Sequence, residues 1–492
     1  MSTATPRAAA LLLLLLACAS CSRAPQGPNV LLISIDSLRQ DHLACCGYAR
    51  KTSPAIDRLA EEGLLFEQHL SSSSWTLPGH ASLFTSVPDS VHGAFDTDRK
   101  IPESMHTLAE RFREAGWHTQ GFFAGPYLHP AFGFGQGFES YLDCASYKDL
   151  LDAKSASQWD NDKRVQKASH EDVTNPTVYA AWQKWLAERQ PGPFFTFVHL
   201  WDVHFDYIPP PPFDRQFDPD YTGTVTGRHF FTDPAIHARM PERDKQHIVA
   251  LYDGEIAWTD SFVARMREDL ERAGLLENTI VVITADHGEE LFDHGGKGHR
   301  LTLFDEVLRI PLVLRYPAAL PRGARVKAQT SSIDVGPTLL ELAGLPPATD
   351  VLGTSLVHFA RDPASAHPRR AVSELATVGR NLRTVRTLET KLFDDAARNL
   401  GYWFDLAKDP LEKQPLTEFE SELGKRAFGG YQAEVQRLEA FLNTHPPIEE
   451  HSSAPKDVER SLRELGYTGD QQDAGAPPPE KPRQEPPPAP PK

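Results

Sequence analysis

Acidic and imidazole side chains follow two of the most apolar segments of the chain. Asp36 ends the run NVLLISID (29–36), and Asp286 and His287 lie within TIVVITADHGEE (279–290). Short apolar runs rich in β-branched residues are typical of buried parallel strands, whose carboxyl ends meet at one edge of a sheet, where ligands collect. Two carboxylates that converge beside an imidazole repel each other unless a cation lies between them. We therefore predict a divalent-cation site of these three residues, suited to Ca²⁺, Mg²⁺, Mn²⁺ or Zn²⁺.

A threonine precedes a proline in the segment SSSSWTLPGHASLFTS (71–86), where an apolar helix-like run begins. Pro78 near a helix start would place Thr76 beside unpaired backbone N–H groups, whose partial positive charge favours an alkoxide or a bound oxyanion. Contact with the cation would lower the pKa of the hydroxyl further, so Thr76 is both a candidate nucleophile and a candidate metal ligand. The alternative is that Thr76 is only a helix N-cap.

Alternating strand and helix signals predict the scaffold that positions these residues. Buried strands are expected at 29–36, 193–204, 279–290 and 309–317. Amphipathic helices between them are expected in the segments TSPAIDRLAEEG (52–63, with Ser53 as N-cap and Gly63 as the stop), MHTLAERFREAG (105–116), PTVYAAWQKWLAERQPG (176–192), about 243–274 and SIDVGPTLLELAG (332–344). This βαβ rhythm predicts an α/β fold with a large, mainly parallel sheet covered by helices on both faces.

The pattern changes near residue 370 to short alternating segments, which predict a small C-terminal α+β subdomain with an antiparallel sheet. We expect the main domain at 28–360 and the subdomain at 370–466. The Pro-rich end, 470–492, is expected to be a disordered tail.

The first 21 residues have the layout of an export signal, with Arg7 before a short leucine run and small residues after it. LLAC resembles a bacterial lipobox with Cys18 as the lipidated residue, whereas Cys21 fits that pattern less well. An ordinary cleaved signal peptide is the alternative. The leucine run is too short for a stable membrane span. We expect an exported protein of the cell envelope, anchored to a membrane through lipid on Cys18.

Composition narrows the class of protein. The chain has 492 residues, 40% of them hydrophobic, which is enough for a large core. Its 51 Lys and Arg against 67 Asp and Glu leave a net charge of −16 with no basic stripe, so we expect no nucleic-acid partner. Beyond the N-terminus only Cys45, Cys46 and Cys144 remain, so no disulfide framework can be read, although an exported compartment would permit one bridge.

Several segments together closely resemble the sulfatase family of the alkaline phosphatase superfamily. Their order and spacing match it from about residue 28 to 360, and a further segment resembles the family's C-terminal subdomain. The matching segments are NVLLISIDSLRQDHLACCGYARKTSPAIDRLAEEGLLFEQH, TLPGHASLFTSVPDSVHG, VITADHGEELFDHGGKGH, LRIPLVL, DVGPTLLELAGL and, in the C-terminal part, LGYWFDLAKDPLEKQPL. The resemblance implies that superfamily's fold, a metal-bound active site and attack on sulfate or phosphate esters.

The resemblance also implies roles for single residues. Asp36, Asp286 and His287 match family metal ligands, the last being Asn in many members, and Thr76 matches the nucleophile. His80 stands where the family's Cys/Ser-x-Pro-x-Arg signature has Arg.

A further group matches substrate-binding positions. His204 matches a histidine that contacts substrate or acts as general acid. Lys297 and His299 lie near the lysine that grips the leaving ester, although three extra residues before LRIP blur that alignment. We expect His199 to be a satisfied core histidine, and leave a supporting role open for the side chains of Arg39, His92 and Asp293. His294 and His299 are open to contact with a second cation or only with each other's loop.

Two departures from the family pattern bear on the chemistry. Ser37 occupies the place of a second Asp found in many sulfatases. The family's Cys or Ser becomes formylglycine, whereas Thr76 cannot undergo that conversion, so no formylglycine is expected here. An unmodified Thr resembles the phosphodiesterase and phosphotransferase branches of the superfamily, which pass through a phospho-threonine.

Three functions remain open. The first is a metal-dependent hydrolase of sulfate esters or related phosphate esters, with a small-molecule, glycan or lipid ester as substrate. The second is a Thr-dependent phosphodiesterase or phosphotransferase. The third is a catalytically silent surface lipoprotein that binds anionic ligands. In the catalytic readings Thr76 attacks the ester, Lys297 or His299 neutralises its oxygens, and His204 protonates the leaving alcohol.

Overall fold

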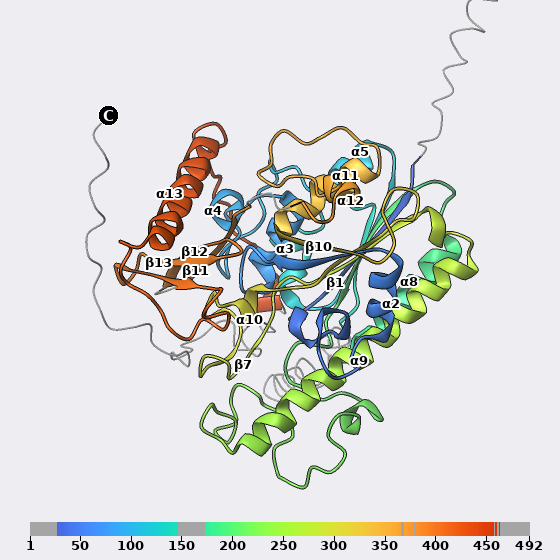
Figure 1. The fold of residues 1–492 in the computed structure, drawn as a ribbon. Coiled ribbons are helices and arrows are strands. Elements are labelled where there is room, and N and C mark those ends of the chain that lie inside the picture. Colours follow the sequence, from blue (N-terminus) through green and yellow to red (C-terminus); the bar gives the residue numbers. More distant parts are fainter. Residues whose placement is uncertain are drawn as a thin grey trace, which may run out of the picture.

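A large twisted sheet forms the centre of the molecule (Figure 1). The computed structural model describes residues 27–145, 173–365, 369–377 and 380–456, together with 458, 459 and 462. The eight strands of the sheet lie in the order β10-β2-β9-β6-β1-β5-β3-β4. Their bounds are β1 (Asn29–Ile35), β2 (Leu64–Leu70), β3 (His118–Phe123), β4 (Ser140–Asp143), β5 (Phe194–Leu200), β6 (Thr279–Thr284), β9 (Leu312–Arg315) and β10 (Ala324–Ser331).

The middle of this sheet is parallel and fully buried. β1 pairs in parallel with β6 on one side and β5 on the other, and every residue of these three strands is buried. Only β9 runs opposite, since it is antiparallel to both β2 and β6. The expected mainly parallel sheet is confirmed. Because β1 lies between β5 and β6, the residues that follow the three strands are brought to one edge.

Helices cover both faces of the sheet, as expected for buried parallel strands (Figure 1). One face carries α2 (Pro54–Glu62), α8 (Asn175–Glu188) and the long α9 (Glu242–Arg272). The other carries α3 (Thr76–Thr85), α5 (Leu108–Glu114) and α11 (Val335–Leu342). α2 has Ser53 at its N-cap, Pro54 at its first position and Gly63 directly after it, as predicted.

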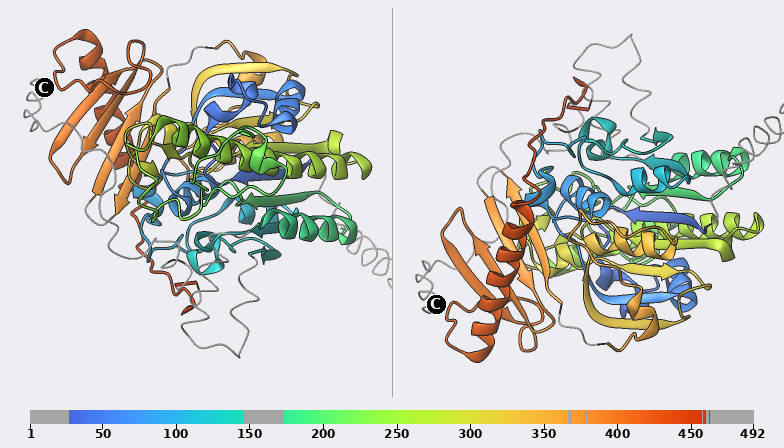
Figure 2. Two further views of the ribbon diagram at one scale, coloured as in Figure 1. Left: turned by 90° about the horizontal axis from the view of Figure 1, so that it is seen from below. Right: turned by 90° about the horizontal axis from the view of Figure 1, so that it is seen from above.

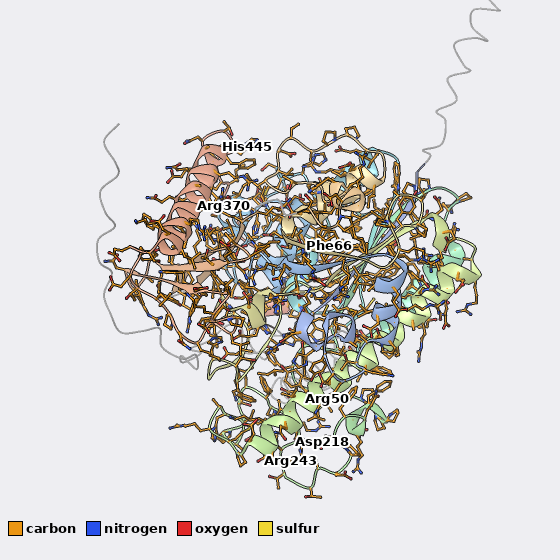
Figure 3. The ribbon with its side chains drawn as sticks, in the orientation of Figure 1. Arg50, Phe66, Asp218, Arg243, Arg370 and His445 are labelled. Atoms are coloured by element: carbon orange, nitrogen blue, oxygen red, sulfur yellow. The ribbon has the colours of Figure 1, made fainter. Side chains whose placement is uncertain are left out.

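The loop between β5 and α9 is fastened to the start of that helix. Arg243, in the first turn of α9, forms a 2.7 Å ion pair with Asp218 of the loop, and both lie far from Phe66 of β2 in the large sheet (Figure 3). The loop therefore leaves the sheet at the end of β5 and is held against the first turn of α9, the helix that follows it.

The C-terminal part forms a separate layer beside the large sheet (Figure 2). Its four strands, β11 (Ala371–Thr377), β12 (Arg380–Arg386), β13 (Thr390–Asp395) and β14 (Leu400–Asp405), are antiparallel in chain order. α13 (Glu422–Leu442) packs on this sheet. The expected small antiparallel subdomain is confirmed.

Short elements complete the described fold. They are α4 (Asp89–His92), α10 (Asp305–Leu308), α12 (His358–Arg361), the ribbon β7 (Glu290–Leu291) and β8 (Lys297–Gly298), and the 3₁₀ helices η1 (Gln40–His42), η2 (Ala44–Cys46), η3 (Pro126–Leu128), η4 (Pro130–Phe132), η5 (Phe213–Arg215), η6 (Leu276–Asn278) and η7 (Ser332–Asp334). The predicted export signal and the Pro-rich tail lie outside the described residues. Within the described part of the chain, no helix has the length and apolar character that crossing a membrane requires.

Candidate active site

The predicted cation ligands meet at the carboxyl edge of the large sheet. Asp36 directly follows β1, and Asp286 and His287 follow the neighbouring β6. His287 Nε2 lies 3.3 Å from Asp286 Oδ2 and 3.8 Å from Asp36 Oδ1. All three side chains are at most 1% exposed. The prediction that strand ends bring them together is confirmed by these distances.

Thr76 is the first residue of α3, and Trp75 occupies the N-cap position before it. Thr76 Oγ1 lies 3.4 Å from His287 Nε2, so the hydroxyl belongs to the same cluster. The helix approaches closely because of Gly79, since a Cβ at that position would lie only 2.7 Å from the carbonyl oxygen of Asp286. The N-cap alternative for Thr76 is therefore not what the structure shows.

The two carboxylates differ in their protonation. Burial by itself would raise the pKa of Asp36, but the neighbouring imidazoles of His199, His204 and His287 hold that pKa below its ordinary value. Burial, and then the charge of Asp36, raise the pKa of Asp286 well above its ordinary value. One carboxylate is thus ionised while its neighbour is driven toward the neutral form, as two buried acids in contact require.

The residues present fit a divalent cation. Asp36 Oδ2 and Asp286 Oδ2 are buried oxygens with no hydrogen-bond partner in the described part of the chain. Buried acceptors are normally satisfied, so two unsatisfied oxygens side by side indicate a ligand that supplies positive charge. Asp36, Asp286 and His287 offer three ligand atoms within 4.8 Å of one another, and Thr76 Oγ1 lies beside them. We call these four residues the first cation site.

His80 lies one helical turn after Thr76 and is completely buried. Its Nδ1 lies 3.0 Å from the carbonyl oxygen of Thr76 and 3.4 Å from Asp286 Oδ2, and its Nε2 lies 2.9 Å from the hydroxyl of Ser34. Burial lowers the pKa of His80 well below its ordinary value, so the ring is neutral. His80 therefore does not bring the fixed positive charge of an arginine to this position.

His204 and His299 lie next to each other beside the cluster. Their ring centroids are 5.1 Å apart, and that of His299 lies 4.3 Å from the ring of His287. His204 Nδ1 lies 2.7 Å from the carbonyl oxygen of Phe205, and His299 Nδ1 lies 3.1 Å from Glu289 Oε1. Burial lowers the pKa of both imidazoles well below its ordinary value. Both predicted histidines are thus brought to the site.

Lys297 is held elsewhere. Its Nζ donates hydrogen bonds to the carbonyl oxygens of Phe230 (2.5 Å) and Ile236 (2.7 Å), in the loop before α9. Burial lowers the pKa of this amine to about 8. The structure places the amine on this loop and shows no hydrogen bond from it to the first cation site among the described residues.

Two further side chains at the site were not predicted. His199 is buried as expected, but its Nε2 has no hydrogen-bond partner in the described structure and lies 3.3 Å from Asp36 Oδ2, so it is not a satisfied core histidine. Arg300 stacks its guanidinium over the ring of Trp75 at 4.4 Å, next to Thr76. In the sequence, His199 could have been noticed as a polar residue inside an apolar strand, and Arg300 as a basic residue directly after His299.

The remaining candidates act at a greater distance. Arg39 donates to Asp293 (2.7 Å), to Asp41 and to the carbonyl oxygen of Glu289, and so ties the segment after β1 to the segment after β6. His294 pairs with Glu306 at 2.5 Å. His92 Nε2 lies 3.1 Å from the Ser82 hydroxyl, between α3 and α4.

Comparisons with known proteins agree with this geometry. The family model described as "Sulfatase" matches residues 28–345, and that of the C-terminal part of N-sulphoglucosamine sulphohydrolase matches 293–423. An ulvan-active sulfatase of Formosa agariphila is 25% identical over 85% of this chain and 81% of its own length.

Solved structures share the fold. A phosphonate monoester hydrolase of Agrobacterium radiobacter superposes with a TM-score of 0.67 at 23% identity, covering 86% of this chain and 96% of the other. A second protein, crystallised with its substrate D-glucosamine-2-N,6-O-disulfate, gives 0.67 at 19% identity, covering 86% and 99%. The match to the sulfatase family model, residues 28–345, covers more than half of the 492 residues of the chain. The chain therefore belongs to the sulfatase family of the alkaline phosphatase superfamily, hydrolases that act on sulfuric ester bonds.

Proposed function

We propose that this protein is a divalent-cation-dependent hydrolase of sulfate esters, or of closely related phosphate esters, that uses Thr76 directly as its nucleophile. The observation that supports this most is the position of Thr76 Oγ1, 3.4 Å from His287 Nε2 at the edge of the first cation site. Family membership supplies the reaction class, and the unsatisfied oxygens of Asp36 and Asp286 supply the need for a cation.

Asp36, Asp286, His287 and Thr76 would hold the cation. When bound, a divalent cation lowers the pKa of a hydroxyl in contact with it and offsets the negative charge of the ester oxygens. Thr76 Oγ1 gives its proton to water and attacks the sulfur or phosphorus atom, while the bond to the leaving oxygen breaks and that oxygen departs with the electron pair. The start of α3 presents backbone N–H groups at the same point, which favours a developing anion.

His204 and His299 are assigned to the leaving group. Because Nδ1 of each ring is bound to a carbonyl or carboxylate oxygen, the orientation of each ring is fixed. We assign proton transfer to the leaving oxygen to the charged form of His204, because Nδ1 holds its hydrogen against the carbonyl of Phe205 and Nε2 must gain a second proton before it can donate one. The negative charge of a bound ester would favour this uptake against burial, which lowers the pKa of the ring. We assign contact with the equatorial oxygens to His299. Arg300, stacked on Trp75, is the permanent cation beside Thr76 and is the better candidate than Lys297 for anion binding.

The unmodified threonine favours a second candidate, a phosphodiesterase or phosphotransferase that passes through a phospho-threonine. Thr76 has no route to formylglycine, whose hydrate releases sulfate by collapsing to the aldehyde. A Thr ester must instead be broken by attack of water or of an acceptor alcohol on sulfur or phosphorus.

A matched substrate panel tests both candidates. The soluble form, residues 22–492, is supplied in turn with Mn²⁺, Mg²⁺, Ca²⁺ or Zn²⁺ and assayed on an aryl sulfate, an aryl phosphate monoester and an aryl phosphodiester. We expect Thr76→Ala to lower kcat roughly a thousandfold or more, and Thr76→Ser to retain part of the activity because it keeps the hydroxyl.

The preferred substrate decides between the candidates. Thr76-dependent release from the sulfate supports the first, and faster release from the diester supports the second. Unchanged turnover in Thr76→Ala at saturating metal would remove Thr76 from the mechanism. No release from any substrate would favour an anion-binding surface protein without catalytic activity.

Location and substrate are proposed on the sequence alone. The proposed export signal and lipid anchor at Cys18 would place the protein in the bacterial cell envelope. A glycan or lipid ester is the substrate class available there, and a net charge of −16 speaks against nucleic acid.

A further inference from the structure

A second group of metal-ligating side chains lies against the first cation site. His80 from α3, His199 from β5 and Asp286 after β6 offer ligand atoms that all lie within 4.8 Å of one another. All three side chains are at most 1% exposed. Only Asp286 belongs to the four residues of the first cation site, so the two imidazoles have no role in the mechanism above.

We propose that His80, His199 and Asp286 form a second cation site, which takes a transition-metal ion of the Zn²⁺ class and shares Asp286 with the first. The inference rests on the proposed cation dependence of the first site and adds a second ion to it.

The surroundings of His199 carry this inference furthest. Its Nδ1 lies 2.6 Å from the carbonyl oxygen of Ala124, and since a carbonyl only accepts, Nδ1 carries the hydrogen. In the neutral ring Nε2 then has a lone pair, and this buried atom has no hydrogen-bond partner within the described residues. It lies 3.3 Å from Asp36 Oδ2, which also lacks one. A cation bound at Nε2 satisfies this nitrogen and offsets the charge of the neighbouring Asp36, and an imidazole held through its other nitrogen is the usual arrangement of a metal ligand.

His80 completes the group from the nucleophile helix. Its Nδ1 lies 3.4 Å from Asp286 Oδ2, a buried oxygen without a hydrogen-bond partner in the same part of the chain. The hydroxyl oxygen of Ser34, 2.9 Å from His80 Nε2, can accept a hydrogen bond from that nitrogen. In that tautomer Nδ1 has a lone pair, and a metal ion would take the place of the contact that Nδ1 makes with the carbonyl oxygen of Thr76, 3.0 Å away.

The ligand types distinguish the two sites. Two imidazole nitrogens and a carboxylate oxygen suit Zn²⁺ or Co²⁺, whereas Ca²⁺ and Mg²⁺ prefer oxygen ligands throughout. Because His80 follows Thr76 by one turn of α3, an ion bound to His80 would also anchor the helix that carries the nucleophile.

Counting bound metal tests the proposal without reference to activity. The full chain is stripped with a chelator, equilibrated with Zn²⁺ alone, freed of loose ions by gel filtration and analysed for zinc per chain. We expect two zinc ions in the wild type, and one in both His80→Gln and His199→Gln. Ca²⁺ in place of Zn²⁺ is expected to fill one site only.

A matched control separates loss of a ligand from loss of a buried histidine. His69 is also completely buried, and its Nδ1 pairs with Thr330 Oγ1 at 2.8 Å, outside both sites. His69→Gln is expected to retain two zinc ions. Far-UV circular dichroism of each apo variant shows whether it has folded, and anomalous scattering at the zinc edge of a crystal locates each ion.

The outcomes also separate this inference from the proposed function. A single zinc in the wild type that persists in His199→Gln would overturn the second site and leave the first one standing. No zinc in the wild type would overturn both. Loss of both ions from folded His199→Gln would show that the two groups are not separate sites, and would likewise overturn the inference.

Discussion

His204 shows how a single ring can be held for proton transfer. It stacks on Trp201 with ring centroids 4.1 Å apart, and its Nδ1 lies 2.7 Å from the carbonyl oxygen of Phe205. Both contacts restrict the ring, and the ring of His299 lies 5.1 Å from it. A proton donor in this place speeds the step in which the leaving oxygen is protonated. The gain in rate is larger for a more basic leaving oxygen, which cannot depart without a proton.

We expect His204→Gln to lower kcat/KM for the hydrolysis of alkyl esters by roughly a hundredfold or more, and that for nitrophenyl esters by less than about tenfold. A nitrophenolate leaves without a proton, so it does not need the donor. The measurement is the slope of kcat/KM against the pKa of the leaving alcohol, which should become steeper in the variant.

The matched control is His118→Gln, because His118 is half-exposed and pairs with Glu139 on the surface. It should leave the slope unchanged. Equal losses on all esters in His204→Gln would assign this residue to binding and not to proton transfer.

The sequence located some site residues and not others for physical reasons. Asp36, Asp286 and His287 could be predicted because they come within three residues of the end of a buried strand, and strand ends converge. His199 could not, because its role depends on which strand lies beside β1, which local sequence does not encode. Arg300 depends in the same way on a distant contact, since its backbone N–H donates to the carbonyl oxygen of Ser74.

At the scale of elements, a buried ionic network joins the antiparallel sheet to the main domain. Lys391 of β13 is completely buried and forms 2.8 Å ion pairs with Asp305 of α10 and with Glu412. Arg386 of β12 pairs with the same Asp305 at 2.8 Å. Removing Lys391 leaves Glu412 buried without this counter-charge and Asp305 with Arg386 alone, which is far more costly than losing an exposed pair.

We expect Lys391→Met to lower the free energy of unfolding by about 3 to 5 kcal/mol, because Asp305 and Glu412 lose their shared cation. Urea unfolding followed by circular dichroism measures the change. Lys408→Met is the control, since Lys408 pairs with Asp405 at the same 2.8 Å but its side chain is 85% exposed.

The control should stay within about 0.5 kcal/mol of the wild type. If the two variants lost equal stability, the buried network would not be what secures this sheet.

Helices and strands could be predicted where their residue types differ clearly from those of loops. The ends of α2 followed from Ser53, Pro54 and Gly63, and the most apolar runs were strands. β10, with the sequence ARVKAQTS, was not predicted, because its polar residues resemble a loop until pairing with β2 is known. The reversed direction of β9 was likewise invisible, since orientation is set by the connection and not by the strand itself.

At the scale of the whole molecule, buried acids make stability depend on pH. Asp260 of α9 accepts hydrogen bonds from the backbone N–H groups of Ala55 and Ile56 at the start of α2. Burial nevertheless raises its pKa from 3.8 to about 7. The native state therefore holds a proton in this pH range that the unfolded chain has already released.

Because the native state binds more protons than the unfolded chain between about pH 4 and 7, Asp260 makes the free energy of unfolding fall as pH rises through that window. The loss from this group is on the order of 4 kcal/mol when complete. In Asp260→Asn, which does not titrate, the curve of unfolding free energy against pH should be flatter between these limits.

The informative quantity is the difference between the two curves, since other buried acids titrate in both proteins. The asparagine loses one N–H contact, which shifts its curve by a constant amount at every pH. Parallel curves would show that Asp260 keeps an ordinary pKa in the native state.

The contact between Gly79 and the carbonyl of Asp286 also limits how this sequence can evolve. Any side chain at 79 would push α3 away from the segment that carries Asp286 and His287, and so move Thr76. Gly429 in α13 meets nothing within 4 Å, and its backbone gains from a Cβ in a helix. Over many generations position 79 should remain glycine under selection for activity, while position 429 drifts freely.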